Sequence, residues 1–373
     1  MTVLTFEQLA LSPAMQRSIA DMGFKEASPI QAEAIPVLLE GHDLIGQAQT
    51  GTGKTAAFSI PLIERIDPAR GPAQALIMCP TRELAVQVGE EIRKLLKHKP
   101  GISVVTIYGG DPIVRQFRAL SKKPQIIVGT PGRMLDHIRR GSIRLNTVQT
   151  VVLDEADEML DLGFRDDIET ILKTTPPARQ TVLFSATMTP QILELANKFQ
   201  RNPHQIKVQQ TATDTARIEQ LYVEVHQRKK LDALIYLIEF HQLSLALVFC
   251  NTKRQVDDLV LRLQDQGYSA DGLHGGMAQP KRAKVLNRFR QGNLQFLVAT
   301  DVAARGIDVR NIEAVFNYDL PKDMEYYVHR IGRTGRAGKS GRAFTFVRRE
   351  ELHQLKKIRR VLNSALLKQE VPA

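Results

Sequence analysis

The chain has 373 residues, 43% hydrophobic and 24% charged, which suffices for two domains and excludes wholesale disorder. No apolar run is long enough to span a bilayer, and the N-terminus lacks the apolar core of a signal peptide, which excludes the membrane-spanning and secreted classes. The formal net charge is +11. Residues 1–217 contribute +2 (25 basic against 23 acidic side chains), and residues 218–373 contribute +9 (26 against 17). The basic excess of the second half fits the binding of a polyanion and fits a solvated basic surface equally well.

Short apolar runs alternate with longer amphipathic stretches along the whole chain. Strands are predicted at Ala75–Cys79, Gln125–Val128, Val151–Leu153, Thr181–Phe184, Leu245–Cys250, Gln295–Ala299, Ala314–Asn317 and Ala343–Val347. Helices are predicted between them at Glu83–Leu96, Arg165–Leu172, Arg254–Gln266 and Lys281–Phe289, with a basic terminal helix over Glu350–Leu367. Continuous apolar strands that alternate with helices indicate an α/β fold in which helices cover both faces of parallel sheets.

The two cysteines, Cys79 and Cys250, each end a predicted strand. Two cysteines are too few for a disulfide framework or a zinc cluster. We therefore expect reduced, partly buried thiols and a cytoplasmic protein.

A faint internal repeat relates the two halves. Ala75–Thr81 (ALIMCPT) aligns with Ala246–Thr252 (ALVFCNT) at an offset of 171 residues, and Ile127–Thr130 aligns with Leu297–Thr300 at an offset of 170. Two matches at nearly one offset predict two copies of one α/β unit. In both copies a threonine follows the strand, at the end where open parallel sheets bind ligands.

Residues 209–217 are small, polar and without periodicity, which is typical of a linker. We therefore expect an N-terminal domain at 1–208 and a C-terminal domain at 218–373.

The strongest local signal is a glycine-rich loop before a predicted helix. Small residues let backbone N–H groups approach phosphates, and the following helix turns its N-terminus towards them. Lys54 is expected to pair with the β- and γ-phosphates of a nucleotide, and the Thr55 hydroxyl to bind Mg²⁺. The loop that follows Ala48 consists of Gln49, Thr50, Gly51, Thr52, Gly53, Lys54 and Thr55.

An apolar strand ends in carboxylates at Val151–Asp157 (VVLDEAD). Asp154 is placed to hold Mg²⁺, and Glu155 to orient or deprotonate an attacking water. Alone, these acids could be a solvated strand end. Together with the phosphate loop they predict hydrolysis of a nucleoside triphosphate.

Arg330, Arg333 and Arg336 follow one another at intervals of three residues in a glycine-broken segment. Guanidinium groups at such spacing are suited to reach a transferring phosphoryl group, although a solvated basic loop is the alternative. If they do reach it, hydrolysis requires groups from both halves of the chain.

These motifs together resemble the DEAD-box RNA helicases of helicase superfamily 2. Asp-Glu-Ala-Asp at 154–157 is the tetrad that gives this family its name, and Ala48 is the usual residue at its position in the family. The resemblance implies two tandem RecA-like parallel-sheet domains, with 1–208 as the ATP-binding helicase domain and 218–373 as the C-terminal helicase domain. The motifs end near Val347, so we expect a helicase core that could be part of a longer protein.

The resemblance adds residues to the nucleotide site. Gln31 is expected to bond the adenine edge bidentately, which favours ATP over GTP, with an aromatic side chain packed against the ring. The implied ATP contacts outside the loop are Phe6, Phe24, Gln31, Gly306 and Asp308.

In the same way, Arg333 and Arg336 match the residues that contact the γ-phosphate in the family. His329 is expected to link to the acidic tetrad, with a packed histidine as the alternative. Ser185 and Thr187 belong to the motif that couples hydrolysis to strand separation, and their hydroxyls could bridge the tetrad, including Asp157, to the arginine segment.

The implied RNA contacts bear hydroxyls, guanidinium groups or exposed backbone N–H groups. This chemistry suits phosphates and 2′-hydroxyls and carries little base information. Arg82 and Arg133 are the preferred pair. The full set is Thr81, Arg82, Gly110, Thr130 and Arg133 in the first half, and Thr252, Arg254, Gly276, Arg282 and Thr300 in the second.

The expected function is that of an ATP-dependent RNA helicase, with ATP and Mg²⁺ as cofactors, which binds single-stranded RNA and ATP between two lobes and unwinds short duplexes. Two alternatives stay open. One is an ATP-gated RNA clamp or assembly platform with little unwinding. The other is a duplex-DNA translocase, against which the Gln31 motif and the tetrad argue.

Overall fold

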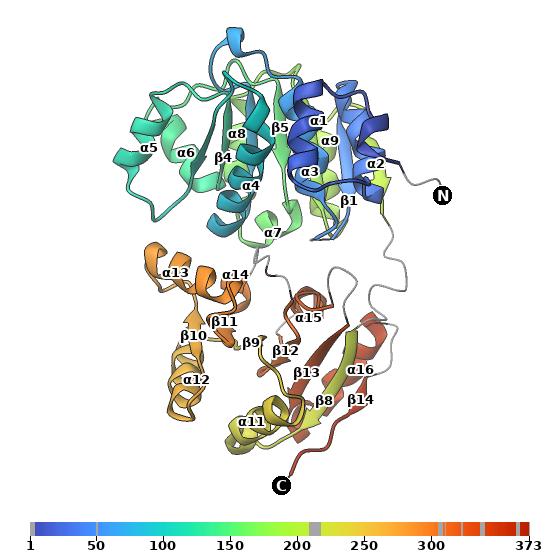
Figure 1. Ribbon diagram of the computed structural model, residues 1–373, viewed down its shortest axis with the longest axis vertical. Coiled ribbons are helices and arrows are strands. Elements are labelled where there is room, and N and C mark those ends of the chain that lie inside the picture. Colours follow the sequence, from blue (N-terminus) through green and yellow to red (C-terminus); the bar gives the residue numbers. More distant parts are fainter. Residues whose placement is uncertain are drawn as a thin grey trace. The chain divides into compact units, whose positions relative to one another are not determined.

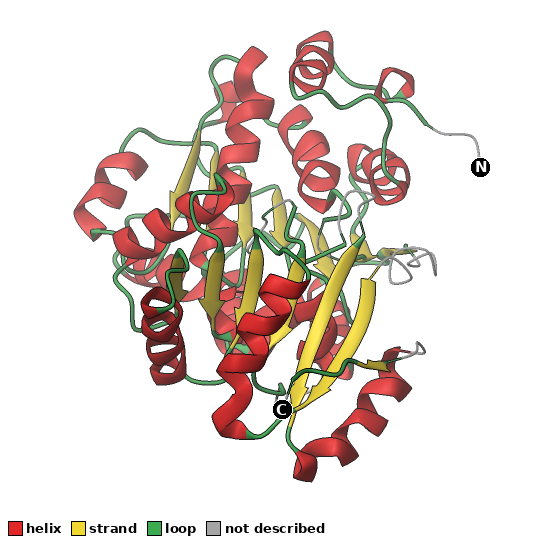
Figure 2. Cartoon of the chain, turned by 60° about the horizontal axis from the view of Figure 1, so that its bottom comes forward, coloured by secondary structure: helices red, strands yellow, loops and turns green. Residues whose placement is uncertain are grey.

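Each half of the chain folds around its own sheet of parallel strands, and helices flank the strands (Figures 1 and 2). The computed structural model describes residues 4–49, 51–208, 218–304, 309, 311–321, 324–335, 340–362 and 366–372. The chain divides into two compact units, Met1–Gln209 and Gln210–Ala373. The predicted linker, 209–217, lies outside the described residues.

The first unit has seven strands in the order β3-β4-β2-β5-β6-β1-β7, and every neighbouring pair is parallel. The strands are β1 Leu44–Gln47, β2 Ala75–Met78, β3 Val104–Ile107, β4 Ile126–Gly129, β5 Thr150–Leu153, β6 Gln180–Ser185 and β7 His204–Lys207. The α-helices are α1 Pro13–Asp21, α2 Pro29–Leu39, α3 Lys54–Glu64, α4 Arg82–Leu95, α5 Ile113–Leu120, α6 Pro131–Arg139, α7 Ala156–Asp161, α8 Arg165–Lys173 and α9 Pro190–Phe199.

The central strands of this sheet are apolar on both faces. Ile77 and Val152 pack in one hydrophobic core, whereas their chain neighbours Leu76 and Val151 pack in a second core on the other face. Successive side chains of a strand point to opposite faces, so a continuous apolar run must be covered by helices on both sides. The predicted α/β fold is therefore confirmed for this half.

The second unit repeats the arrangement in the order β10-β11-β9-β12-β13-β8-β14, again with parallel neighbours. The strands are β8 Ile218–Glu224, β9 Ala246–Phe249, β10 Ala270–Leu273, β11 Phe296–Ala299, β12 Ala314–Asn317, β13 Gly341–Val347 and β14 Leu367–Lys368. The α-helices are α11 Lys230–Phe240, α12 Lys253–Asp265, α13 Gln279–Arg290, α14 Asp301–Ala304, α15 Met324–Ile331 and α16 Leu352–Leu362.

The two sheets have the same strand order when each strand is matched to its counterpart in chain order, β1 to β8 through β7 to β14. The strands that the repeat aligned, β2 with β9 and β4 with β11, are counterparts, so the predicted internal repeat is confirmed. Both cysteines are unpaired and buried. No helix among the described residues combines the length and apolarity needed to cross a membrane.

The predicted terminal helix was wrong at its end. Helix α16 covers Leu352–Leu362, whereas Leu367 belongs to the short strand β14 and pairs with Leu221 of β8. The edge of β8 offers unpaired backbone groups, and a strand added there satisfies them. This long-range pairing overrides the local helical pattern of the segment.

Candidate active site

A left-handed glycine closes the phosphate loop of the first unit. The chain leaves β1 at Gln47 and enters α3 at Lys54, with Gly53 (φ 90°) at the helix N-cap. A Cβ at Gly53 would lie 2.4 Å from Nε2 of Gln31, so any other residue would strain the backbone and displace the Gln31 carboxamide. The Thr52 hydroxyl donates to the Gln49 carbonyl at 2.8 Å and holds the loop together. The N-terminus of α3 therefore follows directly from a tight loop, as phosphate binding requires.

Two opposite charges are buried beside this loop. Lys54 is 6% exposed and Asp154 is 2% exposed. Neither Nζ of Lys54 nor Oδ1 of Asp154 has a hydrogen-bond partner among the described residues. Burial raises the pKa of the Asp154 carboxyl, while the Lys54 ammonium opposes that rise. Buried charged atoms without partners cost folding free energy, so they mark a place for a charged ligand.

This pair tests whether the residues fit a magnesium–nucleotide complex. An ammonium aimed at no protein acceptor suits phosphate oxygens, and a carboxylate oxygen without a donor suits a hard divalent cation. Thr55, in the first turn of α3, adds a hydroxyl to the same neighbourhood. Lys54, Thr55 and Asp154 therefore fit a magnesium–nucleotide complex.

Glu155 has a left-handed backbone, φ 53° and ψ 55°, at the N-cap of α7. A non-glycine residue in this region stores about 1–3 kcal/mol of strain, which persists where the surroundings fix it and is concentrated at functional sites. The side chain is buried, with 5% exposure. The strand β5 ends at Leu153, two residues before Glu155, so the turn presents Asp154 and Glu155 together at the carboxyl end of the sheet.

Asp157 links the acidic tetrad to the segment after β6. Its Oδ2 accepts three hydrogen bonds, from the backbone N–H of Ala186 (3.1 Å), the backbone N–H of Thr187 (2.9 Å) and the Thr187 hydroxyl (2.9 Å). The Ser185 hydroxyl instead donates to the Thr187 carbonyl at 2.6 Å. The Thr187 hydroxyl therefore contacts the tetrad, and the Ser185 hydroxyl stabilises the turn after β6. The bridge from these hydroxyls to the arginine segment stays a prediction.

Gln31 is tied to the phosphate loop. Its Oε1 accepts from the Ser28 backbone N–H at 2.9 Å, and its Nε2 donates to the Gly53 carbonyl at 3.1 Å. A carboxamide has two donor hydrogens and two acceptor lone pairs, so one of each stays available for an adenine edge. Phe6 stacks on Phe24 with ring centroids 6.0 Å apart, which brings the two predicted aromatic residues together.

The predicted RNA contacts of the first unit follow two neighbouring strands. Thr81 caps α4 directly after β2 and accepts from the Leu84 backbone N–H at 3.2 Å, and Thr130 stands at the N-cap of α6 after β4. Because β2 and β4 pair in parallel, both helix starts lie at one edge of the sheet. Gly110 has φ 89°, and Arg133 lies in the first turn of α6. The structure therefore gathers these candidates in one region.

The second unit repeats this placement. Thr252 caps α12 after β9, and Thr300 follows β11, which pairs with β9 in parallel. Arg254 lies in the first turn of α12. Arg282, by contrast, is 7% exposed and donates from Nη1 to the His274 carbonyl at 3.1 Å, so its guanidinium supports the loop that carries Gly276. The RNA contact of Arg282 stays a prediction.

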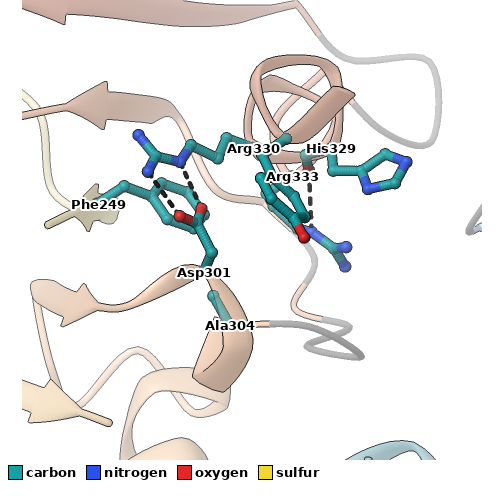
Figure 3. A pocket seen from close by; sticks show the side chains of 7 residues that line it. Phe249, Asp301, Ala304, His329, Arg330 and Arg333 are labelled. Atoms are coloured by element: carbon teal, nitrogen blue, oxygen red, sulfur yellow. Dashed lines mark hydrogen bonds and ion pairs between the residues drawn. The ribbon is translucent and has the colours of Figure 1, made fainter. Parts of the chain in front are cut away.

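Figure 3 shows the small pocket of the second unit in which Arg330 and Arg333 diverge. Arg330 is 1% exposed, makes a paired contact with Asp301 in which its Nη2–Oδ2 distance is 2.7 Å, and lies over the Phe249 ring. Arg333 turns away, and its Nε donates to the His329 carbonyl at 3.2 Å. The interpretation of three equivalent phosphate-binding arginines is therefore wrong for Arg330, whose guanidinium is occupied by its buried ion pair with Asp301.

Comparison with known proteins identifies the family. The DEAD/DEAH box helicase model matches residues 28–195, and the helicase conserved C-terminal domain model matches residues 229–338. The DEAD-box ATP-dependent RNA helicase CshA of Bacillus cereus (strain ATCC 10987 / NRS 248) is 52% identical over 368 residues, which span 99% of this chain and 70% of that protein. The chain belongs to the DEAD-box helicase family. CshA of Bacillus subtilis (strain 168) is 51% identical over 355 residues, 95% of this chain and 72% of that protein.

Solved structures of DEAD-box helicases share the fold. S. cerevisiae Dbp5 bound to RNA and ADP BeF3 matches with a TM-score of 0.88 and 34% identity over 98% of this chain and 95% of that chain. Mss116p bound to single-stranded RNA and AMP-PNP matches with a TM-score of 0.89 and 30% identity over 100% of this chain and 80% of that chain. The two tandem RecA-like domains implied by the sequence are confirmed.

Several predicted site residues of this DEAD-box protein lie outside the described residues. They are Thr50, Gly306, Asp308 and Arg336.

One contributor to the nucleotide site was missed. The Ser28 hydroxyl donates to the Thr52 carbonyl at 2.8 Å and so joins α2 to the phosphate loop. Ser28 and Gln31 also form a capping box at the start of α2, with Pro29 at the first helical position. The pattern Ser-x-x-Gln before an apolar run is a helix-start signal, and it could have identified Ser28 from the sequence.

Proposed function

We propose that this DEAD-box protein is an ATP-dependent RNA helicase whose two units both supply groups to ATP and to single-stranded RNA. The observation that carries the proposal is the buried, unpartnered pair of Lys54 Nζ and Asp154 Oδ1 beside a phosphate loop. ATP is the nucleotide because the remaining donor and acceptor of Gln31 suit the adenine edge. RNA is the polymer because the gathered hydroxyls and guanidinium groups suit phosphates and 2′-hydroxyls.

The chemistry is the transfer of the γ-phosphoryl group of ATP to water. Lys54 holds the β- and γ-phosphates, and Glu155 orients the water and takes its proton. The water oxygen bonds to the γ-phosphorus, the bond from that phosphorus to the bridging oxygen breaks, and ADP and phosphate result. Arg333, with Arg336, neutralises charge that develops on the transferred group. Thr55 and Asp154 would hold Mg²⁺, which supplies further charge neutralisation at the phosphates.

Helicase action follows from the shared ligands. Because ATP and RNA each draw on both units, each ligand favours the same arrangement of the units and raises the affinity for the other. RNA held in this arrangement is bent so that its complementary strand cannot follow, and a few base pairs separate. Loss of the γ-phosphate removes the contact of Arg333 and releases the RNA.

Strand displacement tests this function. A labelled strand of a short RNA duplex should be released when ATP is added and retained with ADP. An RNA clamp would instead show persistent RNA binding with a non-hydrolysable ATP analogue and little strand release with ATP.

Arg133→Ala should weaken RNA binding about tenfold or more, because a charge-assisted contact to phosphate is lost. The measurement is RNA affinity by fluorescence anisotropy in the presence of a non-hydrolysable ATP analogue. Arg139→Ala, an exposed position at the end of the same helix, is the matched control and should bind RNA almost as the wild type does. Weakened nucleotide binding with unchanged RNA binding would remove Arg133 from the RNA site.

A further inference from the structure

The buried side chain of Gln116 joins two segments that carry predicted RNA contacts. Gln116 lies on α5, which neighbours α6 in the first unit (Figure 1). Its Nε2 donates to the Tyr108 carbonyl at 2.9 Å and to Oδ2 of Asp111 at 3.2 Å, on either side of Gly110. Its Oε1 accepts from Nη1 of Arg133 at 3.1 Å. One carboxamide therefore connects the glycine loop to the arginine of α6.

The network around Gln116 permits a single arrangement of its hydrogen bonds. The Oε1 also lies 2.9 Å from Nε2 of His137, and Gln116 is only 3% exposed. The two N–H donors of Gln116 face the Tyr108 carbonyl and the Asp111 carboxylate, and its Oε1 faces the Arg133 guanidinium. A flipped amide would place its NH₂ group against that guanidinium, so the flipped form is excluded. His137 must then donate from Nε2, while its Nδ1 lies 2.8 Å from the Ser142 hydroxyl. Burial lowers the pKa of His137, and a neutral ring with its proton on Nε2 supplies the donor that Gln116 accepts from.

Arg133 is held by one end of its guanidinium. Its Nη1 donates both to Gln116 and to the Asp111 carbonyl, the latter at 3.1 Å, and these are its hydrogen bonds among the described residues. The donors of Nε and Nη2 therefore remain for an external phosphate. An arginine that is already ordered loses less conformational freedom when it binds.

We propose that Gln116 is a positioning residue for RNA binding, which sets Arg133 and the glycine loop of Tyr108–Asp111 in their RNA-binding geometry. This inference rests on the proposed function. Gln116 acts through Arg133, and His137 keeps the Gln116 carboxamide oriented. Gln116 lies in none of the motifs from which the RNA contacts were predicted.

Gln116→Met tests the inference, because methionine keeps the length and volume of the side chain and removes its four hydrogen bonds. RNA affinity in the presence of a non-hydrolysable ATP analogue should fall about 3- to 10-fold. In the Arg133→Ala background the same substitution should change RNA affinity less than about twofold, since the group it positions is gone. Nucleotide affinity without RNA should stay at the wild-type value.

Gln200→Met is the matched control for burial. Gln200 is 9% exposed in the same unit, and its Nε2 donates to the carbonyls of Leu44 and Thr181 at 2.9 Å each, near the start of β1 and β6. This variant should lose stability to urea and keep its RNA affinity. If Gln116→Met does not fold, His137→Leu should weaken RNA binding while His137→Gln, which keeps a donor for Gln116, restores it.

The outcomes separate the inference from the proposed function. Wild-type protein that fails to bind RNA contradicts the function. If wild-type protein binds RNA, two results overturn the positioning role. One is that Gln116→Met lowers RNA affinity equally in the wild-type and Arg133→Ala backgrounds. The other is that Gln116→Met and Gln200→Met lower RNA affinity equally. Loss of RNA affinity that depends on Arg133 supports it.

Discussion

Lys54→Ala is expected to reduce ATP turnover by about 10²- to 10³-fold or more, because it removes a buried positive charge from the place where the transferred phosphoryl group develops negative charge. The Nζ of Lys54 makes no hydrogen bond to any described residue, so the side chain is held for a ligand and the variant loses that ligand contact. Steady-state phosphate release at saturating RNA, followed over a range of ATP concentrations, measures the effect on kcat and KM separately.

The control is Lys198→Ala, an exposed lysine of the same unit that pairs with Glu169 on the surface. It should keep turnover within about twofold, since surface ion pairs contribute little to stability. Both variants should unfold in a single urea transition for the first unit. Turnover within a few-fold of wild type in Lys54→Ala would show that the loop at residues 48–55 does not bind the reacting phosphates.

Glu155→Gln is expected to lower turnover by about 10²- to 10⁴-fold while preserving ATP binding, because glutamine keeps the shape of the side chain and cannot accept the water proton. In the proposed mechanism, blocked hydrolysis preserves the γ-phosphate and its contact with Arg333. RNA should therefore dissociate from the variant much more slowly in ATP than from the wild type. Stopped-flow release of fluorescent RNA, chased with unlabelled RNA, measures this rate.

Glu158→Gln is the matched control, since Glu158 is a buried acid of α7 that lies three residues after Glu155. It should hydrolyse ATP and release RNA at rates near those of the wild type. Rapid RNA release from Glu155→Gln in ATP, together with lost turnover, would contradict the role of Glu155 and point to a general loss of the active conformation.

The apolar runs were sufficient to predict the central strands, because a strand buried on both faces has a composition that few other elements share. Strands β3 and β10 lie at the sheet edges and were not predicted. The four residues of β10, Ala-Asp-Gly-Leu, include two that disfavour strands, and the strand forms because it pairs with β11. Such pairing depends on residues distant in the sequence.

At the candidate site, the roles of several side chains also depend on partners that are distant in the sequence. Arg330 and Arg333 lie three residues apart in one motif and both are buried, yet their partners differ. Arg330 binds Asp301 and Asn317 from other segments of the fold, whereas Arg333 donates to the His329 carbonyl of its own segment. Gln116 carries no local signal, since its partners come from a loop and from α6. The motifs were sufficient to predict the positions of Lys54, Asp154 and Glu155, because each of these residues lies in or next to the loop that follows a strand.

The most direct test of the central claim is steady-state ATP turnover with no nucleic acid, with single-stranded RNA and with single-stranded DNA of the same sequence. Coupling between the ATP and RNA sites predicts strong stimulation by RNA and weak stimulation by DNA, because contacts to the 2′-hydroxyl distinguish the two polymers. Equal stimulation by RNA and DNA would contradict RNA-specific recognition. Absence of stimulation by either would contradict the coupling of ATP hydrolysis to RNA binding in this chain.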